Sequence, residues 1–141
     1  MNIKIEENKN ALSYGEISTL TDLVGWGKDF YPTETKWKKV VSASSYIAYA
    51  RDGNELIAFG RILEDGIMCM FYDIAIHPKY QSKGIGKALM NHLISKIRDE
   101  GYISIGLFVW DGNPTAIKFY EKLGFEQVVG MELKKYHRVF D

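Results

Sequence analysis

The chain has 141 residues, of which 46% are hydrophobic and 26% charged, so it is long enough for one folded domain with its own core. Lys plus Arg and Asp plus Glu number 18 each, and this balance argues against nucleic acid or an anionic membrane as a partner. The single cysteine, Cys69, excludes an internal disulfide. No signal-peptide pattern and no apolar run of about 18 residues is present, so a cytoplasmic protein is expected.

The first part of the chain predicts a short strand and two helices. Apolar and polar residues alternate over residues 3–5, which favours a strand. Ser13 and Glu16 have the spacing of a capping box, so a helix is expected to begin after Ser13 and to run to the glycines near residue 25. Thr33 can cap a second helix that ends at about Ala43.

The middle of the chain predicts three strands and a long helix. Turn residues at 52–54 and 65–66 separate the three expected strands, which are Tyr46–Arg51, Leu56–Leu63 and Ile67–Ile76. Apolar residues then recur every four positions on a helix that is expected to end near Gly101, and they are Ile85, Leu89, Leu93 and Ile97.

The last part predicts a strand, a short helix and two closing strands. In chain order these are Ile103–Val109, Pro114–Leu123, Phe125–Val129 and Met131–Val139. The succession strand, long helix, strand requires a parallel crossover, whereas hairpins join the other strands. We therefore expect one α/β domain over residues 1–141, with a mixed, mostly antiparallel sheet and helices on both faces.

The segment from Asp73 to Lys87 carries the most functional information. An apolar strand ends at Ile76, and Gly84 and Gly86 stand where the long helix begins. Free amide groups at a helix start bind anions, and glycines let a diphosphate approach the backbone closely. A Walker-type loop and a dinucleotide fingerprint both fit poorly, because residues that each requires are missing. The alternative is that the two glycines only permit a tight turn.

Two motifs resemble those of the GNAT acetyltransferase superfamily. Gln81, Gly84 and Gly86 form the pattern Gln-x-x-Gly-x-Gly, which resembles that family's acetyl-CoA diphosphate signature. The segment 113–125 resembles its second signature, Asn-x-x-Ala-x-x-Phe-Tyr-x-x-x-Gly-Phe. The resemblance implies an acyltransferase (an N-acetyltransferase) that moves the acetyl group of acetyl-CoA to a primary amine. It also implies the GNAT fold, in which the parallel strand pair splays apart.

The same resemblance implies a set of coenzyme-binding and catalytic residues. The coenzyme-binding residues expected are Ile74, Ala75, Ile76, Gln81, Ser82, Lys83, Gly84, Ile85, Gly86, Lys87, Asn113 and Tyr120. Tyr120 is also the expected general acid, because a phenol keeps its proton at neutral pH and can give it to a departing thiolate. Each of the last two residues has a structural alternative: Tyr120 as a core aromatic residue and Asn113 as a helix N-cap.

The sequence leaves the general base open. Met70 stands where many family members have a glutamate, and Asp73 is the nearest carboxylate, with a structural role in the sheet as its alternative. Further candidates are Glu64, Asp65, Asp111 or a chain of water molecules. Cys69 is not expected to act as a nucleophile, because no histidine lies close to it along the strand. The three histidines lack the spacing of metal ligands, so no metal is expected.

A small-molecule amine is the expected acceptor: an aralkylamine, a polyamine or an amino sugar. In the family, the first two helices and the last strands line the acceptor pocket, and the aromatic residues there are Trp26, Phe30, Tyr31, Trp37, Trp110 and Tyr136. The sequence leaves open whether a protein or peptide amine is the acceptor and whether the protein is a homodimer. Two rival classes are a coenzyme-binding sensor without catalysis and a nucleotide-binding α/β domain.

Overall fold

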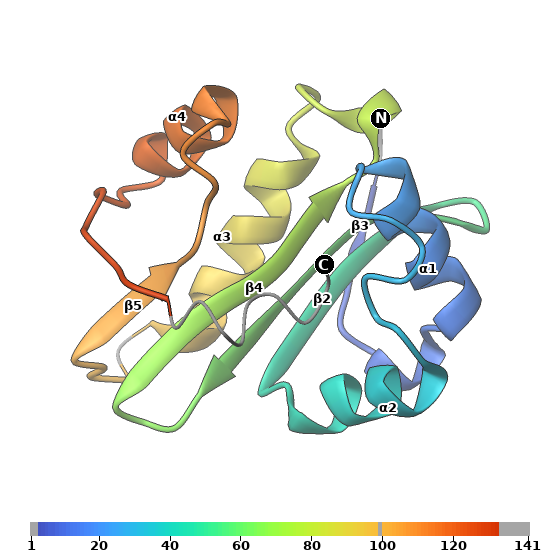
Figure 1. Cartoon of the computed structure of the whole chain (residues 1–141), viewed down its shortest axis with the longest axis horizontal. Coiled ribbons are helices and arrows are strands. Elements are labelled where there is room, and N and C mark those ends of the chain that lie inside the picture. Colours follow the sequence, from blue (N-terminus) through green and yellow to red (C-terminus); the bar gives the residue numbers. More distant parts are fainter. Residues whose placement is uncertain (1–2, 99, 133–141) are drawn as a thin grey trace. The chain divides into compact units, whose positions relative to one another are not determined.

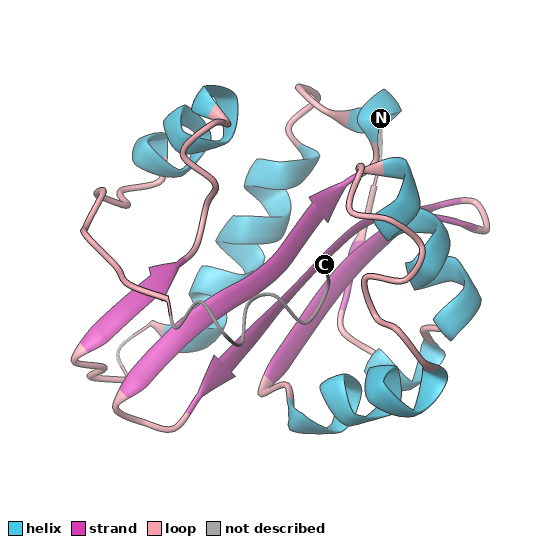
Figure 2. Cartoon of the chain, viewed as in Figure 1, coloured by secondary structure: helices cyan, strands magenta, loops and turns pink. Residues whose placement is uncertain are grey.

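The computed structural model describes residues 3–98 and 100–132, and the chain divides after Phe108 into two compact units. The first unit holds a five-stranded sheet in the order β1-β2-β3-β4-β5 (Figures 1 and 2). Its strands are β1 Ile5–Glu6, β2 Tyr46–Asp52, β3 Glu55–Glu64, β4 Met68–Ile76 and β5 Ser104–Leu107. Neighbouring strands are antiparallel except for β4 and β5, which are parallel. The predicted mixed, mostly antiparallel sheet is confirmed.

Helices lie on both faces of this sheet. In Figure 1, α3 passes behind the strands, whereas α1 and α2 lie in front of them. The bounds are α1 Tyr14–Leu23, α2 Glu34–Ala43 and α3 Ile85–Ile97, with two short 3₁₀ helices, η1 Lys9–Ala11 and η2 Pro78–Tyr80. Among the described residues, no helix is long and apolar enough to cross a membrane.

Side-chain caps fix the starts of α1 and α2, as the sequence predicted. The Ser13 hydroxyl accepts a hydrogen bond from the Glu16 N–H at 3.2 Å, and the Glu16 carboxylate accepts one from the Ser13 N–H at 2.7 Å. This reciprocal pair is a capping box, which satisfies two amide groups that the helix cannot. At α2, the Thr33 hydroxyl accepts from the Lys36 N–H at 3.1 Å. The two caps confirm both predicted helix starts.

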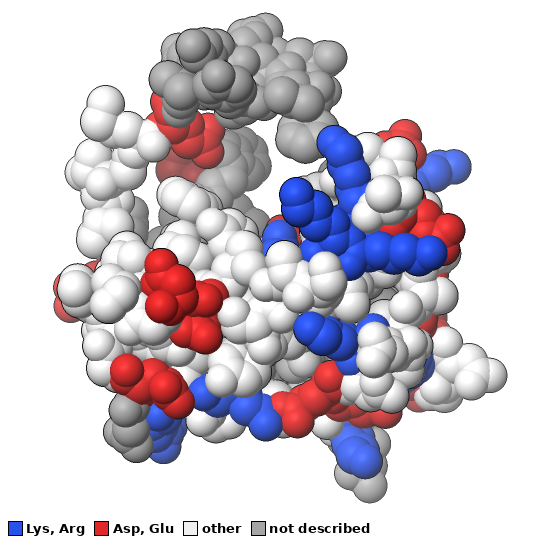
Figure 3. All heavy atoms as spheres, turned by 90° about the horizontal axis from the view of Figure 1, so that it is seen from below, with Lys and Arg blue, Asp and Glu red and all other residues white. Residues whose placement is uncertain are grey.

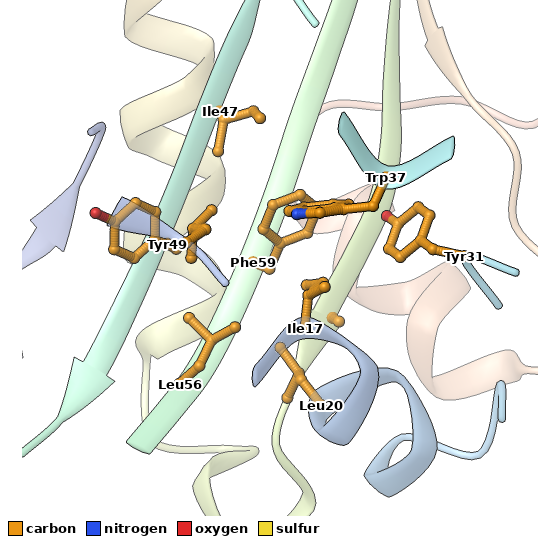
Figure 4. Close-up of a cluster of buried hydrophobic side chains, with 10 residues drawn as sticks. Ile17, Leu20, Tyr31, Trp37, Ile47, Tyr49, Leu56 and Phe59 are labelled. Atoms are coloured by element: carbon orange, nitrogen blue, oxygen red, sulfur yellow. The ribbon is translucent and has the colours of Figure 1, made fainter. Parts of the chain in front are cut away.

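The core beneath α1 and α2 is rich in aromatic rings (Figure 4). Ile17 and Leu20 of α1 are fully buried, and Trp37 of α2 is 2% exposed. The Trp37 ring lies 4.9 Å from the ring of Tyr31 and 5.7 Å from that of Phe59, measured between ring centres. This packing joins α1, α2 and the segment between them to β3 of the sheet.

On the opposite face, α3 packs closely against β3. Leu89 and Leu93 of α3 are fully buried. Gly60 of β3 lies directly under them, since a Cβ atom there would come within 2.7 Å of Ile74 Cδ1 and 3.1 Å of Leu93 Cδ1. The absence of a side chain at Gly60 is therefore what lets helix and sheet approach.

Charges of both signs are exposed in the described part of the protein. Within α2 alone, three of six consecutive residues are lysines, at positions 36, 38 and 39. On the face drawn in Figure 3, the largest group of Lys and Arg lies at the upper right, and further Lys and Arg lie along the lower edge beside Asp and Glu. The balanced net charge is thus a sum of local groups of opposite sign.

The second unit contains α4, Pro114–Lys122, and it corrects one prediction. No strand occurs over residues 125–132, although a strand was expected at Phe125–Val129. The Phe125 N–H bonds back to the Tyr120 carbonyl at 3.1 Å, which ends the helix, and Val128 and Val129 are 89% and 98% exposed. Apolar composition alone does not make a strand, because strand formation depends on pairing as well as on propensity. The expected strand Met131–Val139 lies outside the described residues from position 133 onward.

Strand β5 and the end of α3 also differ from expectation. The strand covers Ser104–Leu107 rather than Ile103–Val109, and it is not buried, since Ile103 is 79% and Ile105 46% exposed. No described element of the first unit covers these side chains. The burial that was expected from their apolar character is therefore not found. Helix α3 ends at Ile97, because Arg98 already has an extended backbone.

We predict that Gly60→Val destabilises the protein by about 1–3 kcal/mol, because the new methyl groups would be forced against Ile74 and Leu93. Gly15→Ala is the matched control, since it lies in α1 with no atom within 4 Å of the new Cβ. It should leave the free energy of unfolding unchanged or raise it by roughly 0.5–1 kcal/mol. Denaturant unfolding of both variants measures this, and equal stability of the Gly60 variant and the wild type would contradict the packing described here.

Candidate active site

An exposed bend of unusual backbone conformation leads from β4 into α3. Ser82 and Gly84 both have positive φ angles, +62° and +84°, and residues 81–84 are exposed. A serine seldom adopts such an angle, whereas glycine does so without strain. Successive backbone turns of this kind direct amide groups to one side and form concave sites for anions.

The start of α3 adds free amide groups to this bend. Gly84 is the N-cap of the helix, and no side chain caps it. The first backbone bond of the helix runs from the Ala88 N–H to the Gly84 carbonyl at 3.0 Å. The N–H groups of residues 85–87 therefore have no acceptor within the helix, and the helix dipole makes this end positive. The bend and the helix start together can hold a diphosphate.

Side chains fasten the bend to the sheet. The Gln81 side-chain amide donates to the Ile76 carbonyl at 3.0 Å, which ties the bend to the last residue of β4. The Tyr80 hydroxyl donates to the Asp52 carboxylate at the turn between β2 and β3. His77 Nδ1 accepts from the N–H of residue 79 at 3.1 Å. Gln81 thus acts here through the position of the bend, and no side chain among the described residues accepts a hydrogen bond from the amides of residues 82–84.

Strand β4 continues beyond its parallel neighbour. The last pair between β4 and β5 is Phe71–Leu107, yet β4 runs on to Ile76. Over residues 72–76, β3 is the only strand paired with β4 among the described residues. Ile74, Ala75 and Ile76 lie in this part, so backbone groups on the open side can bond to an extended ligand in the manner of an added strand.

A β-bulge interrupts β4 at the same point. Phe59 pairs with Ala75, but Arg61 pairs with Tyr72, so two residues of β4 stand opposite Gly60. Asp73 is one of the two, and its φ angle is +56°. A bulge of this kind bends the strand and redirects a side chain.

The bulge places the Asp73 carboxylate between two donors. Its Oδ2 atom accepts from the Tyr31 hydroxyl at 2.5 Å and from Arg61 Nε at 2.8 Å. Burial and the negative charge of Asp73 raise the pKa of Tyr31 well above its usual value, so this hydroxyl remains a donor. Sequence reasoning missed both partners, although an arginine inside the otherwise apolar strand β3 was a signal for a buried carboxylate.

In the second unit, Asn113 and Tyr120 occupy the two ends of α4. Asn113 caps the helix, since its side-chain oxygen accepts from the Ala116 N–H at 3.1 Å. Tyr120 is half-buried, with its ring 5.2 Å from that of Phe119 and 5.9 Å from that of Phe125. Burial raises the pKa of Tyr120 to about 12, so its hydroxyl keeps its proton at neutral pH.

The other carboxylates and the thiol that the sequence offered lie in different surroundings. Glu64 and Asp65 are at the turn before β4, about 25 Å along the strand from the bend. The Asp65 carboxylate accepts from the N–H groups of Met68 and Ile67, which lower its pKa. Burial raises the pKa of Cys69 to about 11, so this residue is a core thiol. Asp111 belongs to the second unit and is exposed.

The aromatic residues expected at the acceptor pocket divide into core and surface. Tyr31 and Trp37 are 5% and 2% exposed and belong to the core of the first unit (Figure 4). Trp26 is 40% exposed, and its ring centre lies 4.9 Å from that of Phe30. Trp110 is exposed in the second unit, and Tyr136 lies outside the described residues.

A surface hollow of about 610 Å³ lies elsewhere in the first unit. Residues of η1, of the start of α1 and of α2 line it, and none belongs to β4 or to the bend. Beside the bend itself is a smaller hollow of about 110 Å³, lined in part by Ile5, Gly84 and Ala88. Size alone therefore does not select a candidate site, and the bend and the part of β4 that has no β5 neighbour among the described residues are considered instead.

Comparison with known proteins agrees with this geometry. A sequence model of the acetyltransferase (GNAT) family matches residues 12–125. The uncharacterized N-acetyltransferase ycf52 of Pyropia yezoensis is 34% identical over 129 residues, which are 87% of this chain and 70% of that protein. The [ribosomal protein bS18]-alanine N-acetyltransferase of Escherichia coli is 41% identical over 56 residues, but these are only 40% of this chain and 38% of that protein.

Solved structures share the fold. A probable acetyltransferase from Staphylococcus aureus has a TM-score of 0.79 at 21% identity, with 94% of this chain and 98% of that chain covered. The ribosomal-protein-S18-alanine N-acetyltransferase from Escherichia coli has a TM-score of 0.70 at 22% identity, with 91% and 80% covered. Because the family match spans most of the sequence and both signature motifs, this chain belongs to the acetyltransferase (GNAT) family and is an acyltransferase.

Proposed function

We propose that this enzyme transfers the acetyl group of acetyl-CoA to a primary amine by direct attack. The observation that carries the proposal is the exposed bend before α3, where Ser82 and Gly84 have positive φ angles and the first helical amides have no acceptor within the helix. Such a site suits the diphosphate of coenzyme A.

The coenzyme would be held at three places. Residues 81–87 would surround the diphosphate, with Lys83 and Lys87 adding positive charge. The pantetheine arm would bond to backbone groups of residues 74–76, where β4 has no neighbour on its β5 side among the described residues. Asn113 would add a side-chain contact, as its place in the second motif implies.

In the proposed reaction, the amine nitrogen attacks the thioester carbonyl carbon, and the carbon–sulfur bond breaks. The amine must give up a proton, and the departing sulfur must gain one. We assign the first transfer to Asp73, directly or through water, and the second to Tyr120. The high pKa of Tyr120, about 12, keeps its proton available at neutral pH.

The acceptor that we propose is a small primary amine with an apolar part. Support comes from the partly exposed Trp26–Phe30 ring pair, because aromatic faces bind apolar groups and cations. Phe30 also contacts Tyr31, whose hydroxyl binds Asp73, so the ring pair and the carboxylate belong to one connected cluster. Aralkylamines fit this cluster best, followed by polyamines and amino sugars.

A second candidate acceptor is the α-amine of a protein N-terminus. The observation that favours it is the 41% identity over 56 residues to the [ribosomal protein bS18]-alanine N-acetyltransferase of Escherichia coli. The matched segment is short, so the likeness supports the same general reaction more strongly than the same substrate.

An amine panel tests the proposal. Purified protein is incubated with acetyl-CoA and, separately, 2-phenylethylamine, spermidine, glucosamine and a peptide with a free N-terminal alanine. We expect saturable release of the coenzyme thiol together with a small-amine product heavier by one acetyl group. Acetylation of the peptide alone would show that the acceptor is a protein N-terminus and not a small amine. Thiol release without any acetylated product would contradict both proposed acceptors.

We predict that Gly84→Ala weakens acetyl-CoA binding by at least about tenfold, because a Cβ disfavours the left-handed backbone that presents the amides. Gly66→Ala is the matched control: its φ is +87°, close to the +84° of Gly84, and no atom lies within 4 Å of either new Cβ. Both variants should lose similar stability, roughly 1 kcal/mol, but only the Gly84 variant should lose affinity. Titration calorimetry distinguishes them, and equal affinities would show that the bend does not hold the coenzyme.

We predict that Tyr120→Phe lowers kcat by about 10²-fold while the acetyl-CoA dissociation constant changes little. Since the pKa of Tyr120 is raised to about 12, its proton is retained below that pH, and the fold-loss should be constant from about pH 6 to 9. Tyr102→Phe is a control that removes a tyrosine hydroxyl from the first unit. Steady-state rates with the best amine of the panel measure the effect, and an unchanged rate for Tyr120→Phe removes this residue from the mechanism.

A further inference from the structure

We propose that Arg61 and Tyr31 are positioning residues that fix the orientation of the Asp73 carboxylate for the acceptor amine. This inference rests on the role of Asp73 in the proposed function. Arg61 comes from β3 and Tyr31 from the segment between α1 and α2, so two elements distant in sequence converge on one carboxylate of β4.

Both hydrogen bonds fall on the same oxygen. The Tyr31 hydroxyl and Arg61 Nε both donate to Oδ2, and no described residue donates to Oδ1. Within residues 3–98 and 100–132, Ser18 Oγ is the one fully buried side-chain polar atom that has no hydrogen-bond partner. Oδ1 of Asp73 also lacks a described donor but is not such an atom, so it is not fully buried. One carboxylate oxygen is thus anchored, and the other is left to accept from a ligand or water.

The two donors are themselves held in place. The Arg61 guanidinium lies over the Tyr72 ring at 5.1 Å from its centre, and Nη1 donates to the Ser44 hydroxyl at 3.4 Å. Tyr31 is 5% exposed, and its ring contacts those of Phe30 and Trp37, each at 4.9 Å between centres. Donors that packing has already fixed can impose one orientation on their acceptor.

The backbone at Asp73 points to the same conclusion. Its φ angle of +56° suits glycine, and asparagine or aspartate tolerate it better than other side chains do. A glycine would form the bulge without strain but would supply no carboxylate. The sequence instead places here a side chain whose Oδ2 takes two hydrogen bonds, while its Oδ1 has no donor among the described residues. In this arrangement Arg61 and Tyr31 act on the amine only through Asp73.

A double-mutant cycle tests the inference. Arg61→Met, Tyr31→Phe and Asp73→Asn are made singly, and each of the first two is also combined with Asp73→Asn. For each protein, kcat and the KM values for acetyl-CoA and the amine are measured, and thermal unfolding confirms the fold. Tyr31→Phe keeps the aromatic ring and changes only the hydroxyl, so it remains informative if Arg61→Met unfolds.

We expect each single variant to lower kcat by roughly tenfold or more, with the KM for acetyl-CoA unchanged. In the Asp73→Asn background, the same substitutions should change kcat by less than about twofold, because their effect passes through a carboxylate that is no longer there.

Arg51→Met is the matched control. Arg51 is also a strand arginine that lies over a tyrosine ring at 5.1 Å and binds a carboxylate, that of Glu16, at 3.0 Å. It should lose stability without the loss of kcat. If Arg51→Met lowers kcat as much as Arg61→Met does, the effect is general destabilisation, and the inference is wrong.

Two other outcomes separate this inference from the function on which it rests. If Asp73→Asn lowers kcat but Arg61→Met and Tyr31→Phe do not, or if their effects add fully to it, the positioning role is overturned and the role of Asp73 stands. If Asp73→Asn has wild-type kcat, the proposed base is itself wrong, and the positioning role fails with it.

Discussion

The backbone conformation of residues 82–84 is the constraint on which the rest of the site depends. Positive φ angles at Ser82 and Gly84 turn the chain from β4 into α3 and leave the first amides of the helix open. Amide groups at a helix start favour an anion whatever the surrounding net charge, so a protein with 18 basic and 18 acidic residues can still bind a diphosphate. The Gln81 and Tyr80 side chains, which bond to Ile76 and Asp52, keep this conformation attached to the sheet.

Strand β4 connects the candidate anion site to the residue proposed as the general base, Asp73. It loses its parallel neighbour after the Phe71–Leu107 pair, and its bulge follows at once, at Asp73. Over residues 72–76, β4 thus has no β5 neighbour within the described part of the chain, and the bulge redirects a carboxylate in the same stretch. The position of Gly60 beneath α3 allows the helix to stay close while the strand is distorted.

Local patterns in the sequence predicted most of the fold, whereas contacts between residues far apart in the sequence were not predicted. The Ser13 capping box and the apolar residues at every fourth position of α3 are patterns between residues about one helix turn apart. The two helices predicted from these patterns are both present. The expected strand at Phe125–Val129 was wrong, because β-propensity depends on structural context and apolar composition alone does not fix it. The bend was predictable from its glycines, and its left-handed Gly84 agrees with that expectation. The bonds of Tyr31 and Arg61 to Asp73 join residues 42 and 12 positions apart, and no short motif encodes them.

The most direct test of our central claim compares two ligands that share a thioester arm. Titration calorimetry of the wild-type protein is performed with acetyl-CoA and with S-acetylpantetheine, which lacks the diphosphate and the nucleotide. We predict saturable one-site binding of acetyl-CoA that is at least about a hundredfold tighter, since several charge-assisted hydrogen bonds to the diphosphate would be lost. Equal affinities for the two ligands, or no saturable binding of acetyl-CoA by the folded protein, would contradict the claim that the bend before α3 binds the diphosphate.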